Sequence, residues 1–374
     1  MRSLNRVTVS RSALAHNFNL CRNLAGDAGL LALLKADGYG HGMVDCARLF
    51  AELGAAAFGV AEVVEGIALR NSGIKLPVLV LAGVMPDTLA ALVKADLTPV
   101  LSDAGPVAAL SRLAAEHGRE LGVFIKLDAG MGRQGVLPGD FPDLVQAIQS
   151  ADHLYLAGVL AHFPSADEPG SSCSDQVVRT FRETVAPIKA LAGEQCCLHL
   201  ANSGGLFYVA DALFDMVRPG IALYGYYPDG AAGARSARPP LLRPAMRFTT
   251  RVLQVRQVPA GSKLGYGHLF TTTRPSTIAI LPVGYEDGYL RILTGRAQVL
   301  LHGRRCPVVG RISMNLTMVD VTDLAEVRPG DEAVLLGEQG EECITADEIA
   351  EWMETISYEV LCLFGNLNDR ELVD

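Results

Sequence analysis

The sequence has no long hydrophobic run, and this absence sets the first limits. No apolar stretch of its 374 residues is long enough to span a bilayer, so we expect no membrane partner. The opening segment, MRSLNRVTVSRSAL, contains arginines but no continuous apolar stretch, which argues against a secretory signal. The net charge of -9 disfavours nucleic acid or an anionic membrane as a partner. We therefore expect a cytoplasmic protein.

The chain also lacks the cysteine spacing of a metal site. Its eight cysteines show no paired ligand pattern, and the adjacent Cys196 and Cys197 lie in an apolar run. We predict that most are buried thiols in a reducing compartment, and we expect no metal. Neither a Walker loop nor a GxGxxG fingerprint with a downstream acid is present, which disfavours a nucleotide site.

What the chain does have is a repeated alternation of short apolar runs with helical patterns. The runs end near Ala36, Ala61, Gly83, Asp103, Gly130, Phe163, Asn202 and Gly220. This alternation is typical of parallel strands joined by crossover helices. Eight such units over about 220 residues predict a (β/α)8 barrel, with an open doubly wound sheet as the alternative.

The composition and the apolar pattern of the sequence change near residue 230. The segment DGAAGARSARPPLLRP has the composition of a linker, and the segments after it have β character. We predict one late helix, at ADEIAEWMETI. The predicted organisation is therefore a barrel over residues 1–235, followed by a mainly β domain over residues 236–374.

Polar residues follow the predicted barrel strands, and Lys35 is the first of them. It comes directly after LLALL and before ADGYGHG. A lysine at this place either extends its charge to solvent or points into a cavity. In a cavity, burial would favour the neutral amine, which can react with an aldehyde cofactor.

Other strand ends carry ionisable or polar groups too: Lys126, Asp128, Arg133, His162, Asn202, Ser203 and Arg218. Each alone has a structural explanation, such as a core histidine, a helix cap or a buried ion pair. Because the strand ends of a parallel barrel meet at one mouth, together they predict a binding site. Ser203 to Gly205 and Gly220–Ile221 resemble the loops that hold phosphate. A lysine beside a phosphate cradle suggests pyridoxal phosphate.

Several motifs resemble those of bacterial alanine racemases. The segment LLKADGYGHG is similar to the family's pyridoxal-phosphate signature, and further blocks follow in family order: KLDAGMGRQG, LAHF, ANSGG, VRPGIALYG, LGYGHLF, LPVGYEDGY, GRISMN and SYEVLCLFG. The resemblance covers nearly the whole chain. It implies a barrel followed by a β domain, and a head-to-tail homodimer in which the partner's β domain completes each active site.

The resemblance also implies roles in proton transfer. Lys35 matches the lysine that holds the cofactor and acts as the base for the D-enantiomer, and Tyr266 matches the opposing base from the other subunit. His162 and Arg218 match the groups near this tyrosine, and Arg218 matches the arginine that faces the pyridine nitrogen. Arg133 matches the arginine that meets the phenolic oxygen of the cofactor and the carboxylate of the substrate. Two bases on opposite faces suit a racemisation, because one base cannot easily reach both faces of a planar carbon.

The remaining matched residues bind or orient. Met314 falls where a backbone N–H meets the substrate carboxylate, and Lys126 falls where many relatives carry a carbamylated lysine. The positions that match the family's phosphate site are Tyr39, Ser203, Gly220, Ile221 and Tyr358.

One departure from the family pattern opens an alternative substrate. Asn315 follows Met314, where many members have aspartate. The loss of that charge makes a serine or broad-specificity racemase an alternative to an alanine racemase.

Three further functions remain open from the sequence. A pyridoxal-phosphate decarboxylase of the same fold would take a cysteine and an acid from the partner, but Cys362 has the surroundings of a core residue. A non-catalytic carrier of the cofactor would not need the β domain. A metal-dependent barrel hydrolase would need more ligands than His162 and Asp128.

Overall fold

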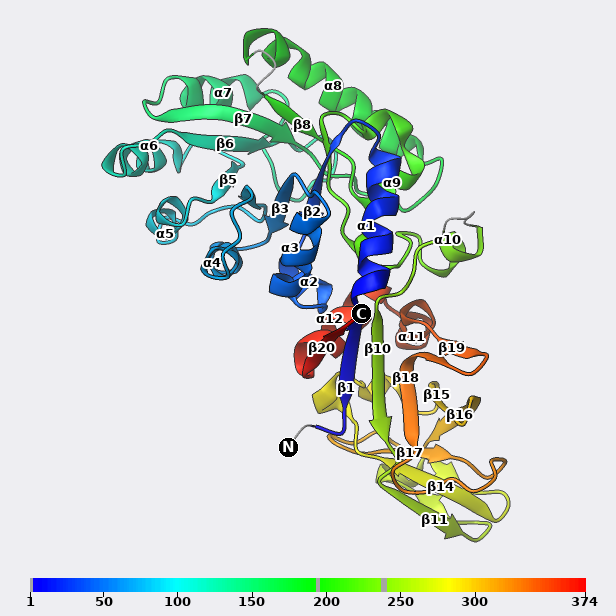
Figure 1. Ribbon diagram of the computed structural model, residues 1–374. Helices are drawn as coiled ribbons and strands as arrows, with labels where there is room; N and C mark the ends of the chain where they lie inside the picture. Colours follow the sequence, from blue (N-terminus) through cyan, green and yellow to red (C-terminus); the bar gives the residue numbers. More distant parts are fainter. Residues whose placement is uncertain (1–2, 193–195, 237–240) are drawn as a thin grey trace. The chain divides into compact units, whose positions relative to one another are not determined.

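The computed structural model describes residues 3–192, 196–236 and 241–374. These residues form two compact units (Figure 1). The barrel unit comprises Ala15–Gly38 and Met43–Leu242. The β unit comprises the chain up to Leu14, Tyr39–Gly42 and Arg243–Asp374.

Eight parallel strands within the described residues close into a barrel in the order β2 to β9, with β9 pairing β2. They are β2 (Gly29–Leu33), β3 (Ala57–Val60), β4 (Val78–Val80), β5 (Thr98–Leu101), β6 (Leu121–Lys126), β7 (Leu154–Leu160), β8 (Cys197–His199) and β9 (Met216–Val217). Each overlaps one of the apolar runs of the sequence, because strands covered on both faces are mainly apolar. The predicted barrel is confirmed, and the open sheet is excluded.

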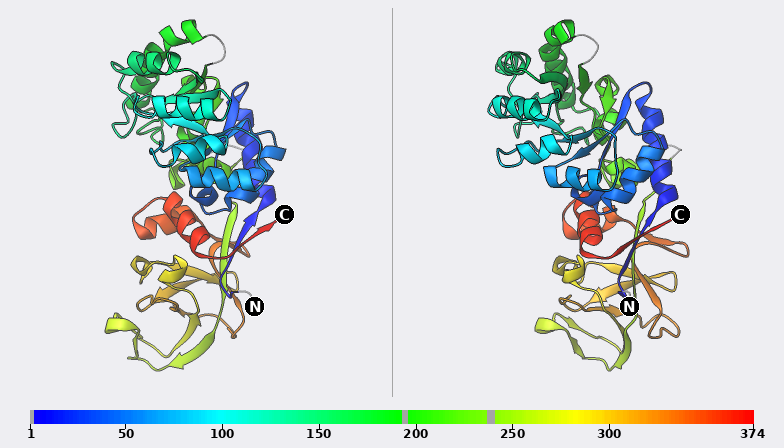
Figure 2. Two further views of the ribbon diagram at one scale, coloured as in Figure 1. Left: turned by 90° about the vertical axis from the view of Figure 1, so that its left-hand side faces the viewer. Right: turned by 60° about the vertical axis from the view of Figure 1, so that its left-hand side comes forward.

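Helices surround the barrel strands in both views of Figure 2. The helices of this part of the chain are α1 (Arg11–Ala25), α2 (Lys35–Tyr39), α3 (Met43–Glu52), α4 (Val63–Asn71), α5 (Leu89–Lys94), α6 (Val107–Glu116), α7 (Phe141–Gln149), α8 (Ser172–Ala192), α9 (Ser203–Tyr208), α10 (Ala231–Ser236) and the short 3-10 helices η2 (Ala210–Ala212) and η3 (Ile221–Tyr224). Ser10 caps α1 by accepting a hydrogen bond from the Ala13 N–H at 3.1 Å. Helix α10 lies within the segment that the composition assigned to a linker.

The strands of the β unit are β1 (Arg6–Ser10), β10 (Met246–Arg251), β11 (Gln254–Val258), β12 (Lys263–Leu264), β13 (Phe270–Thr271), β14 (Ser276–Leu281), β15 (Gln298–Leu301), β16 (Arg304–Val309), β17 (Thr317–Asp320), β18 (Glu332–Gln339), β19 (Glu342–Ile344) and β20 (Arg370–Val373). Its main sheet runs β11-β14-β17-β16-β15-β18-β10-β1-β20. The predicted mainly β character is therefore confirmed. The N-terminal strand β1 pairs with β10 and β20 in this sheet (Figure 1).

Short helices complete the β unit: η4 (Tyr266–His268), η5 (Tyr285–Asp287), η6 (Arg291–Leu293), α11 (Ala346–Met353) and α12 (Ser357–Leu367). The prediction of a single late helix was wrong, since α12 follows α11 and packs beside it (Figure 2). Phe364 of α12 packs against Phe248 of β10 in a tilted arrangement, with ring centroids 4.9 Å apart, so α12 forms part of the core. None of the helices in the described residues has the length and apolar character that a bilayer crossing requires.

Candidate functional site

The C-terminal ends of the barrel strands enclose a cavity of about 260 Å³. Five residues singled out from the sequence line it: Lys35, Lys126, Arg133, His162 and Arg218. Among the described residues of its lining, four are basic and none is acidic. A concave site with this charge favours an anionic ligand.

Lys35 enters this cavity from an unusual backbone turn. It follows β2, and the next three residues lie in the left-handed region: Ala36 has φ 53°, Asp37 has φ 53° and Gly38 has φ 64°. The Gly38 N–H donates to the Leu34 carbonyl at 2.7 Å and closes the turn. A non-glycine residue in this region is disfavoured by its Cβ, and such strained turns are common at functional sites.

Arg218 is buried, with 3% of its surface exposed. Its Nη2 donates to the Ala161 carbonyl at 2.6 Å and to the Leu200 carbonyl at 3.3 Å. Its Nη1 is buried and has no hydrogen-bond partner among the described residues. Burial lowers the pKa of Arg218 to about 10, so the guanidinium stays charged at neutral pH. A buried donor without an acceptor, on a residue that lines a cavity, fits a ligand that supplies the acceptor.

His162, two residues after the end of β7, lies among these cations. Burial, followed by the positive charge of Arg218 and of the other cavity cations, lowers the pKa of His162 to about 3. Its ring is therefore neutral near pH 7 and is a weak proton acceptor.

Lys126, the last residue of β6, donates a hydrogen bond from Nζ to Oε1 of Gln134 at 2.8 Å. Gln134 is fixed in turn, because its Nε2 donates to the Ala82 carbonyl at 2.8 Å. Burial lowers the pKa of Lys126 to about 8, and the positive charge of Arg133 adds to this effect. We did not predict Gln134 from the sequence, since only the folding of its loop brings this uncharged residue to the cavity.

The loop that carries Arg133 folds back on β6. Oδ1 of Asp128 accepts hydrogen bonds from the N–H groups of Gly130 and Gly132, both at 3.0 Å. Burial raises the pKa of Asp128, but these backbone donors outweigh it and hold the pKa below its ordinary value. At Gly135, with φ 135°, a Cβ would lie 2.6 Å from the Asp128 nitrogen, so the turn requires glycine. The backbone geometry of this loop therefore fixes the position of Arg133 at the barrel mouth.

Ser203 and Gly220 form the expected small-residue cradle. Oγ of Ser203 accepts hydrogen bonds from the N–H of Gly220 at 2.9 Å and of Ala222 at 3.3 Å. The hydroxyl hydrogen is then available for donation to a ligand. Asn202 also caps α9, as expected, because its Oδ1 accepts from the Gly205 N–H at 2.8 Å. Ile221 begins η3 directly after Gly220.

Two of the predicted phosphate ligands lie in the β unit. Tyr39 and Tyr358 have ring centroids 6.0 Å apart. Burial, with smaller contributions from Tyr358 and Cys362, raises the pKa of Tyr39 well above its ordinary value. Tyr39 is therefore a neutral phenol that can donate a hydrogen bond.

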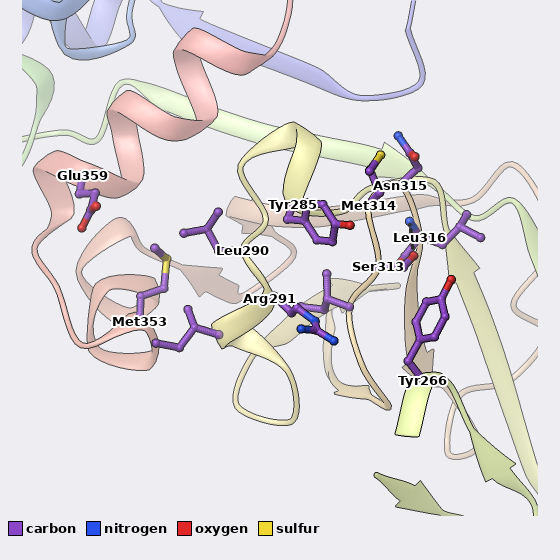
Figure 3. A pocket seen from close by; sticks show the side chains of 12 residues that line it. Tyr266, Tyr285, Leu290, Arg291, Ser313, Met314, Asn315, Leu316, Met353 and Glu359 are labelled. Carbon is purple, nitrogen blue, oxygen red and sulfur yellow. Dashed lines mark hydrogen bonds between the residues drawn. The ribbon is translucent and has the colours of Figure 1, made fainter. Parts of the chain in front are cut away.

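A second, larger cavity, of about 1040 Å³, lies in the β unit and is lined by Tyr266 and Met314 (Figure 3). The Tyr266 side chain is 69% exposed and Met314 is 52% exposed. Tyr285 and Arg291, which we did not predict, also line the cavity. Figure 3 shows the Tyr266 ring pointing toward the loop that carries Met314.

The loop of Met314 is held by the turn at Gly284. The Glu286 N–H donates to the Met314 carbonyl at 3.1 Å, and Nδ2 of Asn315 donates to the Glu286 carboxylate. A Cβ at Gly284 would lie 2.3 Å from the Met314 carbonyl oxygen, so the close approach requires glycine. We did not predict Glu286 from the sequence either.

The whole chain resembles known proteins. The family models "Alanine racemase, N-terminal domain" and "Alanine racemase, C-terminal domain" match residues 9–228 and 245–372. An alanine racemase of Syntrophobacter fumaroxidans is 40% identical over 360 residues, which are 96% of this chain and 95% of that protein.

Solved structures agree with the sequence match. The crystal structure of alanine racemase from E. faecalis has a TM-score of 0.91 and 33% identity, covering 99% of this chain and 98% of that one. An alanine racemase from Bartonella henselae with covalently bound pyridoxal phosphate has a TM-score of 0.88 and 27% identity, covering 99% of both chains. Because the likeness extends over both units and nearly the full length, this chain belongs to the alanine racemase family.

Proposed function

We propose that this protein is a pyridoxal-phosphate-dependent isomerase that interconverts L- and D-alanine. The observation that carries the proposal is the cationic cavity at the barrel mouth, where Lys35 lies with the unpaired guanidinium nitrogen of Arg218. Relatives named alanine racemase support it over the decarboxylase, the carrier and the hydrolase. We place the enzyme in the cytoplasm, because buried thiols such as Cys21 suit a reducing compartment.

The residues of the cavity fit pyridoxal phosphate. Lys35 would bind its aldehyde carbon, and the Arg218 Nη1 hydrogens would find an acceptor in its ring nitrogen. The phosphate would be held by the Ser203 hydroxyl and by the backbone N–H groups of Gly220 and Ile221. The family resemblance gives Tyr39 and Tyr358 the same role. When bound, this cofactor withdraws electrons from the substrate Cα and so makes its proton easier to remove.

Proton transfer needs a second base, and the barrel cavity offers a poor one. His162, with a pKa of about 3, would accept a proton weakly near pH 7. The phenol of Tyr266 is exposed in the β unit. We propose that Lys35 acts on the D-enantiomer and that Tyr266 of a second copy acts on the L-enantiomer. Arg133 and the Met314 N–H of that second copy would hold the substrate carboxylate between them.

A homodimer is the arrangement that this mechanism requires. The cavity that contains Tyr266 is also lined by Met314, Leu316 and Ile292, and each of these residues is between 43% and 52% exposed. Exposed apolar residues gathered at one place favour burial against a protein partner. A second copy of this chain is that partner in our proposal.

We also propose that Lys126 carries a carbamate. The cavity holds Lys35, Arg133 and Arg218 besides Lys126, and a carbamate would place a negative charge among them. The carbamate nitrogen keeps one N–H, so its hydrogen bond to Gln134 would be preserved.

Mixing two inactive variants tests both the function and the shared sites. Lys35→Ala and Tyr266→Phe should each abolish production of D-alanine from L-alanine. In a mixed dimer one site lacks both groups, while the other has Lys35 from one chain and Tyr266 from its partner. Random mixing should therefore restore about a quarter of the wild-type activity.

The outcomes of this experiment separate the two proposals. Wild type without alanine racemisation would refute the proposed activity. Active wild type with no recovery on mixing would refute the shared site. Repeating the assay with L-serine tests the alternative substrate.

A further inference from the structure

The turn that follows Lys35 is held by a residue of a different barrel segment. Ala36 and Asp37 adopt left-handed backbone conformations that their side chains disfavour. Such a turn needs contacts that outweigh its intrinsic cost. The contact that we find at Ala36 comes from Glu65, in the first turn of α4.

The Glu65 carboxylate accepts three backbone hydrogen bonds. Its Oε1 accepts from the Ala36 N–H at 2.8 Å. Its Oε2 accepts from the N–H of Ala61 at 2.7 Å and of Glu62 at 3.1 Å. One side chain thus joins the residue after Lys35 to the end of β3 and the start of α4.

Helix capping explains only half of this arrangement. A glutamate at the third position of a helix commonly accepts the N–H of the capping residue, here Glu62. That role uses Oε2 and does not need Oε1. The bond from Ala36 is therefore additional, and bonds to a charged carboxylate are stronger than neutral ones.

We propose that Glu65 is a positioning residue for Lys35, which keeps Ala36 in its left-handed conformation and so aims the lysine into the cavity. The inference rests on the proposed function of Lys35 as the base for D-alanine. Glu65 itself touches neither substrate nor cofactor in this proposal.

Glu65→Gln is the matched perturbation. The amide has the size of the carboxylate but only one oxygen, and its NH2 group cannot accept a bond. The two donors at Ala61 and Glu62 should keep the oxygen, so the Ala36 N–H loses its acceptor. Glu116→Gln, at an exposed position of α6, is the control for the same chemical change.

Amide hydrogen exchange of the holoenzyme tests the contact independently of activity. We expect the Ala36 amide to exchange about tenfold faster in Glu65→Gln, while the control matches wild type. An unchanged rate at Ala36 would overturn the proposal.

Deuterium at Cα tests whether Lys35 is misplaced. Because the two alanine enantiomers are equally stable, kcat/KM must fall equally in both directions, by about tenfold for a displacement of this kind. The isotope effects need not match. If the step of Lys35 slows, the effect on kcat/KM should rise for D-alanine and fall for L-alanine. A purely structural defect would leave both isotope effects as in wild type, and that result would also overturn the proposal.

A second substitution should rescue the first. Glycine adopts the left-handed region readily, so Ala36→Gly in the Glu65→Gln background should restore part of kcat/KM and the wild-type isotope effects. Failure of that rescue would contradict the role assigned to the backbone. If wild type did not racemise alanine at all, the proposed function would fail, and hydrogen exchange would still decide the Glu65 contact.

Discussion

Carbamylation of Lys126 is the prediction for which the structure supplies a magnitude. Burial and the neighbouring cations lower the pKa of Lys126 from the ordinary 10.5 to about 8. At pH 8 about half of its amine is then neutral, against about 0.3% for an ordinary lysine. Only the neutral amine attacks carbon dioxide, with release of one proton. At this pH Lys126 should therefore offer about a hundredfold more neutral amine than an exposed lysine.

The measurement is incorporation of carbon-13 from labelled bicarbonate. We expect one carbamate signal at pH 8 that weakens as the pH falls, because protonation removes the reactive amine. Lys126→Ala should abolish the signal. Lys94→Ala, at an exposed position in the last turn of α5, should leave it intact.

A substitution at Gln134 gives a second test of the carbamate. Gln134→Leu removes the acceptor of the Lys126 N–H and should lower the occupancy of the carbamate. Wild-type protein without a carbon-13 signal at pH 8 would refute the reasoning, and so would a signal that survives Lys126→Ala.

Four further outcomes follow from the site. The pKa of His162 falls from 6.5 to about 3 on folding, so in this pH range the unfolded chain binds a proton that the folded chain does not. The free energy of unfolding should therefore decrease as the pH falls from 6.5 toward 3. Urea unfolding of His162→Gln should lack this part of the pH dependence. Gly135→Ala places a Cβ against the Asp128 nitrogen at positive φ, and we expect a loss of about 2 kcal/mol in the free energy of unfolding; an unchanged urea midpoint would contradict that clash. Asn315→Asp puts two carboxylates in contact at Glu286, so KM for alanine should rise about threefold above pH 7, whereas an unchanged KM would show that the pair does not position the Met314 loop. Because the amide nitrogen of Asn315 already donates to Glu286, alanine should remain preferred over serine when kcat/KM is compared.

The sequence predicted the barrel because its strands are covered on both faces and are therefore apolar without interruption. β1 offered no such signal. Its five residues alternate in burial, and its neighbours β10 and β20 lie more than 200 residues away in the chain. Helix α12 was missed for a different reason, since SYEVLCLFG is apolar enough to suit a buried strand or a buried helix equally. Asp87, which precedes TLAALV in the sequence and suits a helix cap, lies one residue too early, because α5 takes Thr88 as its N-cap. Gly193 has the sequence position of a helix stop after IKALA, and it lies outside the described residues.

The candidate site was predictable to the extent that it consists of charges at strand ends. Lys35, Lys126, His162 and Arg218 stand next to apolar runs, and a closed barrel brings such positions to one mouth. The residues that hold these side chains in place have no comparable signal in the sequence. Gln134 is uncharged, and its loop had to fold back before it could reach Lys126.

Glu65 shows why the supporting residues escape sequence reasoning in general. Its sequence context is that of an ordinary helix start, and a capping role would account for it fully. Its second oxygen accepts a hydrogen bond from Ala36 only because the backbone after Lys35 is left-handed. Alanine and aspartate in a sequence do not predict that conformation. The reactive residue, Lys35, can therefore be predicted from the pattern of strands. The residue that positions it, Glu65, can be identified only once the backbone conformation is known.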